Sequence, residues 1–541
     1  MNQITDHPTK WDLKRLYPEE QDLMFFTEIE IIEQLIEIYK EEEDLEALSK
    51  IIQKTEKAEY YFYCLSTEQV DESILAVPHT KIMNLKRDVR LLLQEKSNVS
   101  DNASIHFIEN ELKAWEDMYI QLRNRLEIHN NNEVFSFGKA NYLAMNAEAH
   151  HERLEVFSSL TEALEKEKVV FANVLNQMGR LRNIKSNLLQ EKEVLSQSLQ
   201  ANGISNNVLL EMWDTIEGNL EKLSSVIAFH KSNKETFTWH DLMTLEENNQ
   251  IEIPFSLAVK DIYDALKSID EELAEFAQHA IMNGWVDAEP RDNKPPSGFC
   301  APFLSEGESQ ISLRYDGTID SVRVLAHELG HAWHFYVMSN EKSPAFLDDY
   351  LPMSMAESAS IFFEMVLVDY LVQTAEHGNL KKSLLSWKIR NSFNYVMAIR
   401  ASFQFEQTFY EESQKGPLSA DELERLSILS QKAAYGNSLT EYQPFVWMKY
   451  GQFYTANLPF YNYPYTFGYL LSLGLLEIAK QDYEFHSKYK KFLCETGKRP
   501  VEELVKQYFH INLADNEFWE KSLLQINKDV DEYLQLVKEE A

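Results

Sequence analysis

The stretch from Leu23 to Gln250 constrains the fold most, because it is rich in Glu, Lys, Leu and Gln and holds few Pro or Gly residues. Its apolar residues recur with a period of about 3.6, as they do on the buried face of a helix. At 541 residues the chain can bury a large core. We therefore expect long helices packed as a bundle. Two of the expected buried stripes are Ile29, Ile32, Leu35, Ile36 and Tyr39, and Leu160, Leu164, Val169, Leu175 and Met178.

A second helical pattern surrounds the segment Ala326–His334, which reads AHELGHAWH. The window Ser321–Met338 has no Pro, and its apolar residues have helical spacing. Thr318 or Asp320 can cap the start of this helix. The sequence therefore predicts a largely buried helix that carries histidines and a glutamate.

Two histidines of this helix, His327 and His331, lie four residues apart, so both imidazoles point from one face and can bind one metal ion. Glu328 lies beside that face. A carboxylate there can take a proton from a water whose pKa the metal lowers, and can later deliver it to a leaving amine. His334 lies roughly 10.5 Å from His327 along the helix, too far to bind the same ion, so we expect it to pack or to support the site. The alternative is a pair of core histidines with an incidental glutamate.

A third ligand is expected in the helix predicted for residues 354–372. Glu357 lies in its first turn, downstream of His331. Ser354 and Glu357 also match a capping box, in which the glutamate only satisfies a backbone N–H. The residues alone do not decide between ligand and cap. Glu364, on the same face, is a rival ligand or a hydrogen-bond partner for a histidine.

A small β-sheet is expected just before the histidine-bearing helix. Residues 284–318 hold four prolines, four glycines and an alternating run, Gln310–Tyr315. One interpretation is an edge strand that pairs with an extended peptide. The other is a hairpin that only supports the helix. The sequence favours neither.

Composition and charge exclude several classes of protein. The chain has 52 Lys and Arg against 87 Asp and Glu, a formal net charge of −35, which repels nucleic acid and anionic membranes. Cys64, Cys300 and Cys494 form no CxxC pair and offer no disulfide framework or thiolate metal site. The N-terminus shows no apolar signal segment, and the most apolar run, Tyr465–Ala479, is too short to span a bilayer. We expect a cytoplasmic protein without nucleic-acid or membrane partners.

Several motifs together resemble one family. They are the opening WDLKRLYP, the GWVD…SGFC run, RYDGTIDSVRVLAHELGH with the later AES…E, and YNYPYTFGYLLS. With these motifs the chain resembles the thimet oligopeptidase and oligoendopeptidase F family of zinc metallopeptidases, and above all its oligoendopeptidase F branch. The resemblance implies a mostly helical split-clam fold, with a zinc ion at the base of a deep channel and a small sheet beside the HExxH helix. It further implies that His327, His331 and Glu357 bind one zinc ion per chain and that Glu328 is the general base.

The resemblance also implies roles for tyrosines late in the chain. Tyr469 is the best match for a donor to the oxyanion, with Tyr465 and Tyr461 behind it, whereas a core stripe is the alternative. One departure is that the family usually has a histidine shortly before these tyrosines, and residues 378–485 contain none. Gln452 or its neighbours occupy that region. Because glutamine carries no positive charge, we expect weaker transition-state stabilisation or a greater dependence on tyrosine.

Together these observations predict three regions that form one clam-like unit: an N-terminal helical region (1–110), a helical bundle lobe (111–250) and a catalytic region (251–541). The predicted function is zinc-dependent hydrolysis of internal peptide bonds in short oligopeptides, with metal-bound water as the nucleophile. One alternative is a metallocarboxypeptidase on a related scaffold. Another is a non-catalytic peptide-binding homologue, against which the intact Glu328 argues because such a protein needs no base.

Overall fold

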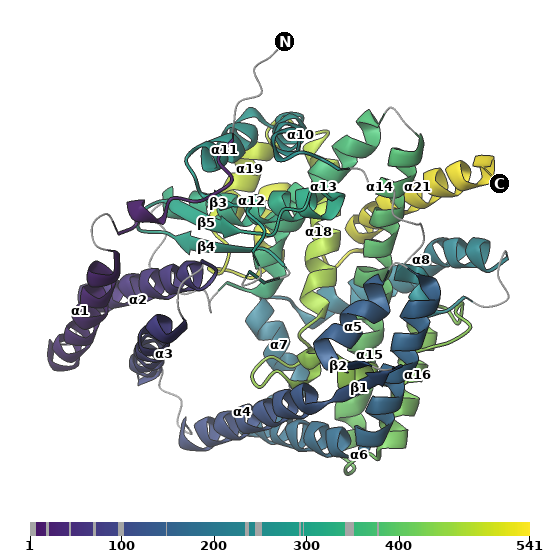
Figure 1. Cartoon of the computed structure of the whole chain (residues 1–541), viewed down its shortest axis with the longest axis horizontal. Coiled ribbons are helices and arrows are strands. Elements are labelled where there is room, and N and C mark those ends of the chain that lie inside the picture. The colour runs from purple at the N-terminus through teal and green to yellow at the C-terminus, as the bar shows by residue number, and fades with distance from the viewer. Residues whose placement is uncertain are drawn as a thin grey trace. The chain divides into compact units, whose positions relative to one another are not determined.

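The computed structural model describes residues 7–17, 21–42, 45–68, 72–95, 102–131, 133–147, 149–232, 237–243, 252–291, 294–295, 297–340, 351–375 and 378–540. As predicted, these residues are mostly helical and include only small sheets (Figure 1). The chain divides into two compact units. Unit 1 comprises Met1–Asn98, Asn248–Leu384 and Gly468–Asn512, and unit 2 comprises Val99–Glu247, Leu385–Phe467 and Leu513–Ala541. Both units are discontinuous, and the predicted region 251–541 contributes to each of them.

Unit 1 is built from helices around a three-stranded sheet. Its N-terminal helices share an apolar core with the sheet, in which Ile29 and Tyr61 are fully buried together with Phe303. The predicted stripe on the first helix is buried, with Leu35 partly so. The helices of unit 1 are η1 (Leu13–Arg15), α1 (Gln21–Glu42), α2 (Leu45–Ser66), α3 (Glu72–Glu95), α10 (Phe255–Lys267), α11 (Glu271–Met282), α12 (Ile319–Asn340), α13 (Met353–Thr374), α19 (Phe485–Cys494) and α20 (Val501–Phe509). Helices α14 (Gly378–Ser392) and α18 (Tyr463–Ala479) run from one unit into the other.

The sheet lies beside α12, as expected from the sequence (Figure 1). Its strand order is β3-β5-β4, with bounds Val286–Asp287 for β3, Glu308–Ser312 for β5 and Phe299–Phe303 for β4. Strand β3 runs parallel to β5, and β4 runs antiparallel to it. The alternating run Gln310–Tyr315 therefore begins in the central strand, so the edge positions belong to β3 and β4.

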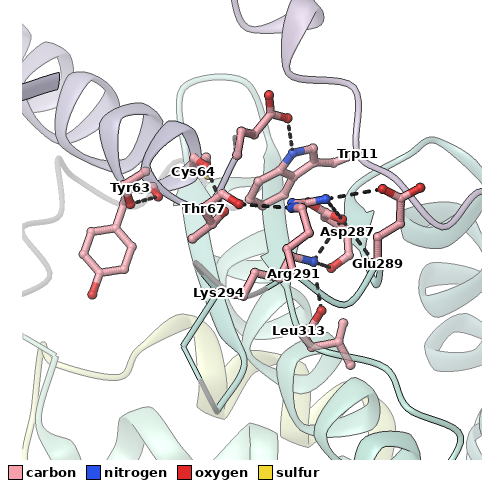
Figure 2. A network of polar contacts seen from close by, with 11 residues as sticks. Trp11, Tyr63, Cys64, Thr67, Asp287, Glu289, Arg291, Lys294 and Leu313 are labelled. Atoms are coloured by element: carbon pink, nitrogen blue, oxygen red, sulfur yellow. Dashed lines mark hydrogen bonds and ion pairs between the residues drawn. The ribbon is translucent and has the colours of Figure 1, made fainter. Parts of the chain in front are cut away.

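A buried ionic network fastens this sheet to the end of α2 (Figure 2). Asp287, at the end of β3, accepts a hydrogen bond from Arg291 Nη1 (3.2 Å) and pairs with Lys294 Nζ (3.0 Å). Lys294 Nζ also donates to the carbonyl oxygens of Asp287 (2.7 Å) and Leu313 (2.9 Å). Arg291 Nε donates to the carbonyl oxygen of Thr67 (3.1 Å). The charged groups of this network therefore find their partners inside the protein.

Unit 2 is a helical bundle with one hairpin, and α6 is the helix that carries the second predicted stripe. Leu160, Leu164, Leu175 and Met178 are buried, but Val169 is 62% exposed, so its assignment to the stripe was wrong. Five residues past Leu164 a helix has turned about 140° away from the buried face. The elements of unit 2 are α4 (Asn102–Arg125), β1 (Glu127–Asn130), β2 (Glu133–Ser136), α5 (Phe137–Asn146), α6 (His150–Leu188), α7 (Val194–Asn202), α8 (Asn206–Ser232), α9 (Trp239–Met243), the π-helix η3 (Phe393–Ala398), α15 (Ile399–Ser413), α16 (Ala420–Ala434), α17 (Val446–Lys449), η4 (Gly451–Tyr454) and α21 (Asn516–Glu540).

None of the helices in the described residues is both long enough and apolar enough to cross a bilayer.

Candidate metal centre

Helices α12 and α13 approach each other closely because Gly330 has no side chain. A Cβ at this position would lie 2.5 Å from the carbonyl oxygen of Ala359 and 2.6 Å from Cα of Ser360. Any larger residue would force the helices apart, since neither backbone can yield by itself. The N-terminus of α12 is fixed by Thr318, one of the two predicted caps, whose Oγ1 accepts a hydrogen bond from the Ser321 N–H (3.2 Å).

This close packing brings His327 and His331 of α12 to Glu357 of α13. Oε2 of Glu357 lies 3.4 Å from Nε2 of His327 and 3.7 Å from Nε2 of His331. A tetrahedral metal ion held at about 2.0–2.1 Å needs donor atoms about 3.3–3.4 Å apart, so the observed spacing fits one ion. Within the described part of the chain, this is the one group of three or more such side chains that could hold a metal ion.

Glu364 contacts the other nitrogen of His327 and is placed as its partner rather than as a rival ligand. Its Oε2 lies 3.1 Å from His327 Nδ1 and accepts a hydrogen bond from Arg323 Nη1 at 3.0 Å. Burial alone would raise the pKa of Glu364, but Arg323 and His327 outweigh it and hold that pKa below its usual range. A hydrogen bond at Nδ1 leaves Nε2 of His327 free for a metal. Arg323 was not predicted from the sequence, although its four-residue spacing from His327 places both on one helix face.

Glu328 is buried, with 5% of its surface exposed, and is not part of the three-residue group. Burial is the main reason why the pKa of Glu328 is raised to about 7. The negative charge of Glu357 raises this pKa further, whereas His327 lowers it. The backbone just before β4 lies against this side chain, because a Cβ at Gly298 would come within 2.8 Å of Glu328 Oε1 and of Val324 Cγ1. Gly298 therefore leaves the carboxyl group its space. In the sequence, Gly298 is part of the SGFC run, which does not by itself indicate this contact.

The centre carries a surplus of negative charge. Three carboxylates, those of Glu328, Glu357 and Glu364, surround two imidazoles and one guanidinium. Burial would lower the pKa of His327, but Glu357 and Glu364 outweigh it and raise that pKa. The carboxylates thus favour a positive charge beside this imidazole, and a bound metal ion would supply that charge in place of the imidazole proton.

The start of α13 and the surroundings of His334 decide two questions that the sequence left open. Helix α13 has Pro352 as its N-cap, so Ser354 lies inside the first turn and the capping-box interpretation of Glu357 was wrong. His334 is almost fully buried, and its Nε2 lies 2.7 Å from Thr496 Oγ1. His334 therefore packs in the core, as expected from its distance along the helix.

The predicted tyrosines are distributed over both units. Tyr469 is buried, with 2% exposed, on the part of α18 that belongs to unit 1, where Ser472 Oγ donates to a carbonyl oxygen of α13 (3.0 Å). Tyr461 and Tyr465 belong to unit 2, and their hydroxyls lie 3.4 Å apart. Gln452 is half-buried in η4 of unit 2. The roles of these four residues stay predictions.

Known proteins with the same fold and sequence pattern place the chain in a family. The chain belongs to peptidase family M3, whose profile matches residues 143–523. It is 23% identical over 402 residues to the chromosomal oligoendopeptidase F of Lactococcus lactis subsp. cremoris, a match that covers 73% of this chain and 65% of that protein. It is 25% identical over 362 residues to an oligoendopeptidase F homolog of Borreliella burgdorferi, covering 65% of this chain and 60% of the relative. These matches therefore span less than two thirds of either relative's length.

Solved structures share the fold over nearly the whole chain. A peptidase-like protein of Chlamydophila abortus superposes with a TM-score of 0.80 at 18% identity and covers 98% of both chains. The oligoendopeptidase F of Enterococcus faecium gives a TM-score of 0.64 at 18% identity, covering 97% of this chain and all of that one (100%). At such identities the likeness establishes the fold.

Proposed function

We propose that this protein is a zinc-dependent metalloendopeptidase that hydrolyses internal bonds of short peptides in the cytoplasm. The observation that supports this most is the convergence of two imidazole nitrogens and one carboxylate oxygen beside a further buried carboxyl group, Glu328. Two imidazoles with one carboxylate are a donor set typical of catalytic zinc. Membership of peptidase family M3 supports the reaction class, and the oligoendopeptidase F relatives support short peptides as substrates.

The chemistry is divided between the metal ligands and Glu328. A zinc ion held by His327, His331 and Glu357 would supply Lewis acidity and lower the pKa of water. Glu328 accepts a proton from the attacking water as the water oxygen bonds to the peptide carbonyl carbon. The same carboxyl group then gives this proton to the amide nitrogen as the C–N bond breaks. A pKa of about 7 suits a group that must both accept and return a proton near neutral pH.

Substrate binding is proposed for three tyrosines and for the edge of the sheet. Tyr469, supported by Tyr465 and Tyr461, would donate a hydrogen bond to the carbonyl oxygen as negative charge develops on it. Strand β4 is an edge strand that begins directly after Gly298, which lies against Glu328. An extended peptide added to this edge would pass the catalytic carboxyl group, whereas a purely supporting sheet would not bind peptide at all.

The decisive test is Glu328→Gln, because glutamine has nearly the same shape but cannot accept a proton. We expect peptide hydrolysis to fall by about 10²–10⁴-fold with zinc content unchanged. Glu37→Gln, on an exposed part of α1, is the matched control and should hydrolyse peptides at the normal rate. Near-normal hydrolysis by zinc-loaded Glu328→Gln would contradict the proposed role.

The alternative functions are separated by the products. A mixed peptide library, digested with and without a chelator and analysed by mass spectrometry, should show internal cuts that disappear when the metal is removed. Loss of single C-terminal residues would instead identify a metallocarboxypeptidase. Peptides that bind without being cut would identify a non-catalytic homologue.

A further inference from the structure

Unit 2 contains a pocket that the proposed reaction does not use. Its volume is about 150 Å³, and its lining comes from α5, α9, the π-helix η3, α15, α16 and the segment from α17 into η4. Trp239, Phe393 and Phe405 give it apolar walls. A cavity of about this volume with apolar walls accommodates a benzene-sized group. Short π-helical turns such as η3 are frequent at functional sites.

Among the residues that the structure describes, one cation and no acidic side chain line this pocket. The cation is Lys449, whose Nζ donates to Gln443 Oε1 at 3.0 Å and lies 5.0 Å from the Trp239 ring centroid. No carboxylate of the described residues forms an ion pair with it, and burial lowers its pKa to about 8, so it stays protonated at pH 7. An ammonium group held away from water without a counter-ion favours an anionic ligand.

Two tyrosines add hydrogen-bond donors to the same pocket. Tyr435 and Tyr450 both line it, and burial raises the pKa of each phenol, so both stay protonated at neutral pH. Beside the ammonium group and the two tyrosines, the polar lining consists of amides and hydroxyls, and no carboxylate of the described residues belongs to it. These amides and hydroxyls are those of Asn141, Asn394, Ser402, Ser427, Gln431 and Gln443. A single positive charge matches a monoanion better than a phosphate, which carries up to two negative charges.

We propose that this pocket binds a carboxylate attached to a small apolar or aromatic group, with the carboxylate at Lys449 and the apolar group against Trp239 and Phe393. Two sources share this chemistry, namely a free aryl- or alkyl-carboxylic acid and the C-terminal residue of a peptide. Ligand binding at this pocket can be measured without any hydrolysis. The proposal therefore does not depend on the proposed peptidase reaction.

The first experiment compares three probes with the same apolar group on the full-length protein by calorimetry. 3-Phenylpropionate should bind at least tenfold more tightly than 3-phenylpropanamide, and 3-phenylpropylamine should not bind measurably. The same order after chelation would show that the carboxylate does not act at the metal centre. Equal affinities for the three probes, or loss of binding on chelation, would overturn the proposal. A peptide ending in Phe, with a free or an amidated C-terminus, then tells which source is preferred.

The second experiment tests Lys449 directly. Lys449→Met keeps the aliphatic part of the side chain and removes the charge, so the affinity for 3-phenylpropionate should fall by about 30-fold or more while that for the amide is kept. Lys432→Met, at an exposed lysine of α16, is the matched control and should bind all probes normally. Unchanged affinity in Lys449→Met would overturn the assignment. If that variant does not fold, Tyr450→Phe replaces it, and a several-fold loss confined to the carboxylate probe is expected.

Discussion

Two clusters of charged side chains lie around the same short sheet of unit 1, and their charge balance differs. In the network of Figure 2, Asp287 and Glu289 face Arg291 and Lys294, so the formal charges cancel. At the metal centre, three carboxylates face the guanidinium of Arg323 and the imidazole of His327, whose pKa they raise. With both imidazoles deprotonated to bind a metal and all three carboxylates ionised, two negative charges would be left. A divalent cation would neutralise this surplus, whereas the network of Figure 2 needs no further ion.

The two clusters also differ in how completely their polar groups find partners inside the protein. The three N–H groups of Lys294 have three acceptors, all within the protein, at 2.7, 2.9 and 3.0 Å. At the metal centre, by contrast, Nε2 of His327, Nε2 of His331 and Oε2 of Glu357 converge within 4.8 Å of one another. A complete set of partners inside the protein stabilises a fold, whereas imidazole nitrogens and a carboxylate oxygen that converge on one point can bind a cation. Proximity of charged residues alone therefore does not mark a functional site.

The largest effect is expected for Glu357→Ala, which removes one of the converging lone pairs. Loss of partners that only orient a ligand typically weakens metal binding by about 10–100-fold, so loss of a ligand should weaken it further. Protein purified without added zinc should be depleted of metal and inactive, as measured by elemental analysis and peptide hydrolysis. Glu37→Ala is the control at an exposed glutamate. Full metal occupancy in Glu357→Ala would show that the carboxylate is not a ligand.

The complementary change in the balanced network is Lys294→Met. It removes the donor to the Leu313 carbonyl oxygen and one of the two donors to the Asp287 carbonyl oxygen, which keeps the Leu313 N–H. It also leaves the Asp287 carboxylate with one cation fewer, so the free energy of unfolding should fall by about 3–5 kcal/mol. Metal content of the folded protein should not change. Lys267→Met removes an exposed lysine that pairs with Glu271, and it should lower the free energy of unfolding far less, because solvent screens this pair. Urea unfolding of the metal-free proteins measures both. Equal effects of the two substitutions would show that the network of Figure 2 does not depend on the charge of Lys294.

The metal centre could be predicted from the sequence only as far as its geometry is local. His327, His331 and Glu328 lie on little more than one turn of α12, so spacing alone determines their directions. Spacing could not decide whether Glu357 is a metal ligand or a helix cap. Its contact with the histidines depends on the close approach of two helices at Gly330. The resemblance to a known family made that choice.

Tertiary packing explains what the sequence did not predict. The network of Figure 2 joins Arg291 to Thr67 and Lys294 to Leu313, and no periodicity connects residues so far apart. The role of Gly298 was not predicted for the same reason, because this residue leaves space for a side chain of another element. The helical character and the small sheet were confirmed because periodicity and Pro or Gly content report local structure. The split-clam shape and the deep channel stay predictions.

A third test asks whether a hydroxyl completes the metal centre. Tyr469→Phe removes only the phenolic oxygen, and a donor to the developing oxyanion is needed mainly in the transition state. We therefore expect kcat to fall by roughly 10²–10³-fold with little change in KM. If Tyr469 is only a buried ring, the variant keeps its activity and changes slightly in stability, and Tyr465→Phe becomes the next candidate. Gln452→His, measured alongside, should raise kcat several-fold if this position takes the place of the family's histidine.

The smallest effect is expected for Glu364→Gln, which changes the charge next to the ligands without removing a ligand. Glutamine can still accept a hydrogen bond, but it no longer carries the negative charge that favours a cation and balances Arg323. Metal affinity should fall by about 10–100-fold, the range found when partners of metal-bound histidines are changed. Once the metal is saturated, kcat should stay close to normal, because Nε2 of His327 and Glu328 are untouched. Competition with a metal-binding dye measures the affinity, and kinetics at saturating zinc measure the rate. Unchanged affinity would mean that the surplus negative charge does not draw the metal in, and the contrast with the neutral network of Figure 2 would then rest on ligand geometry alone.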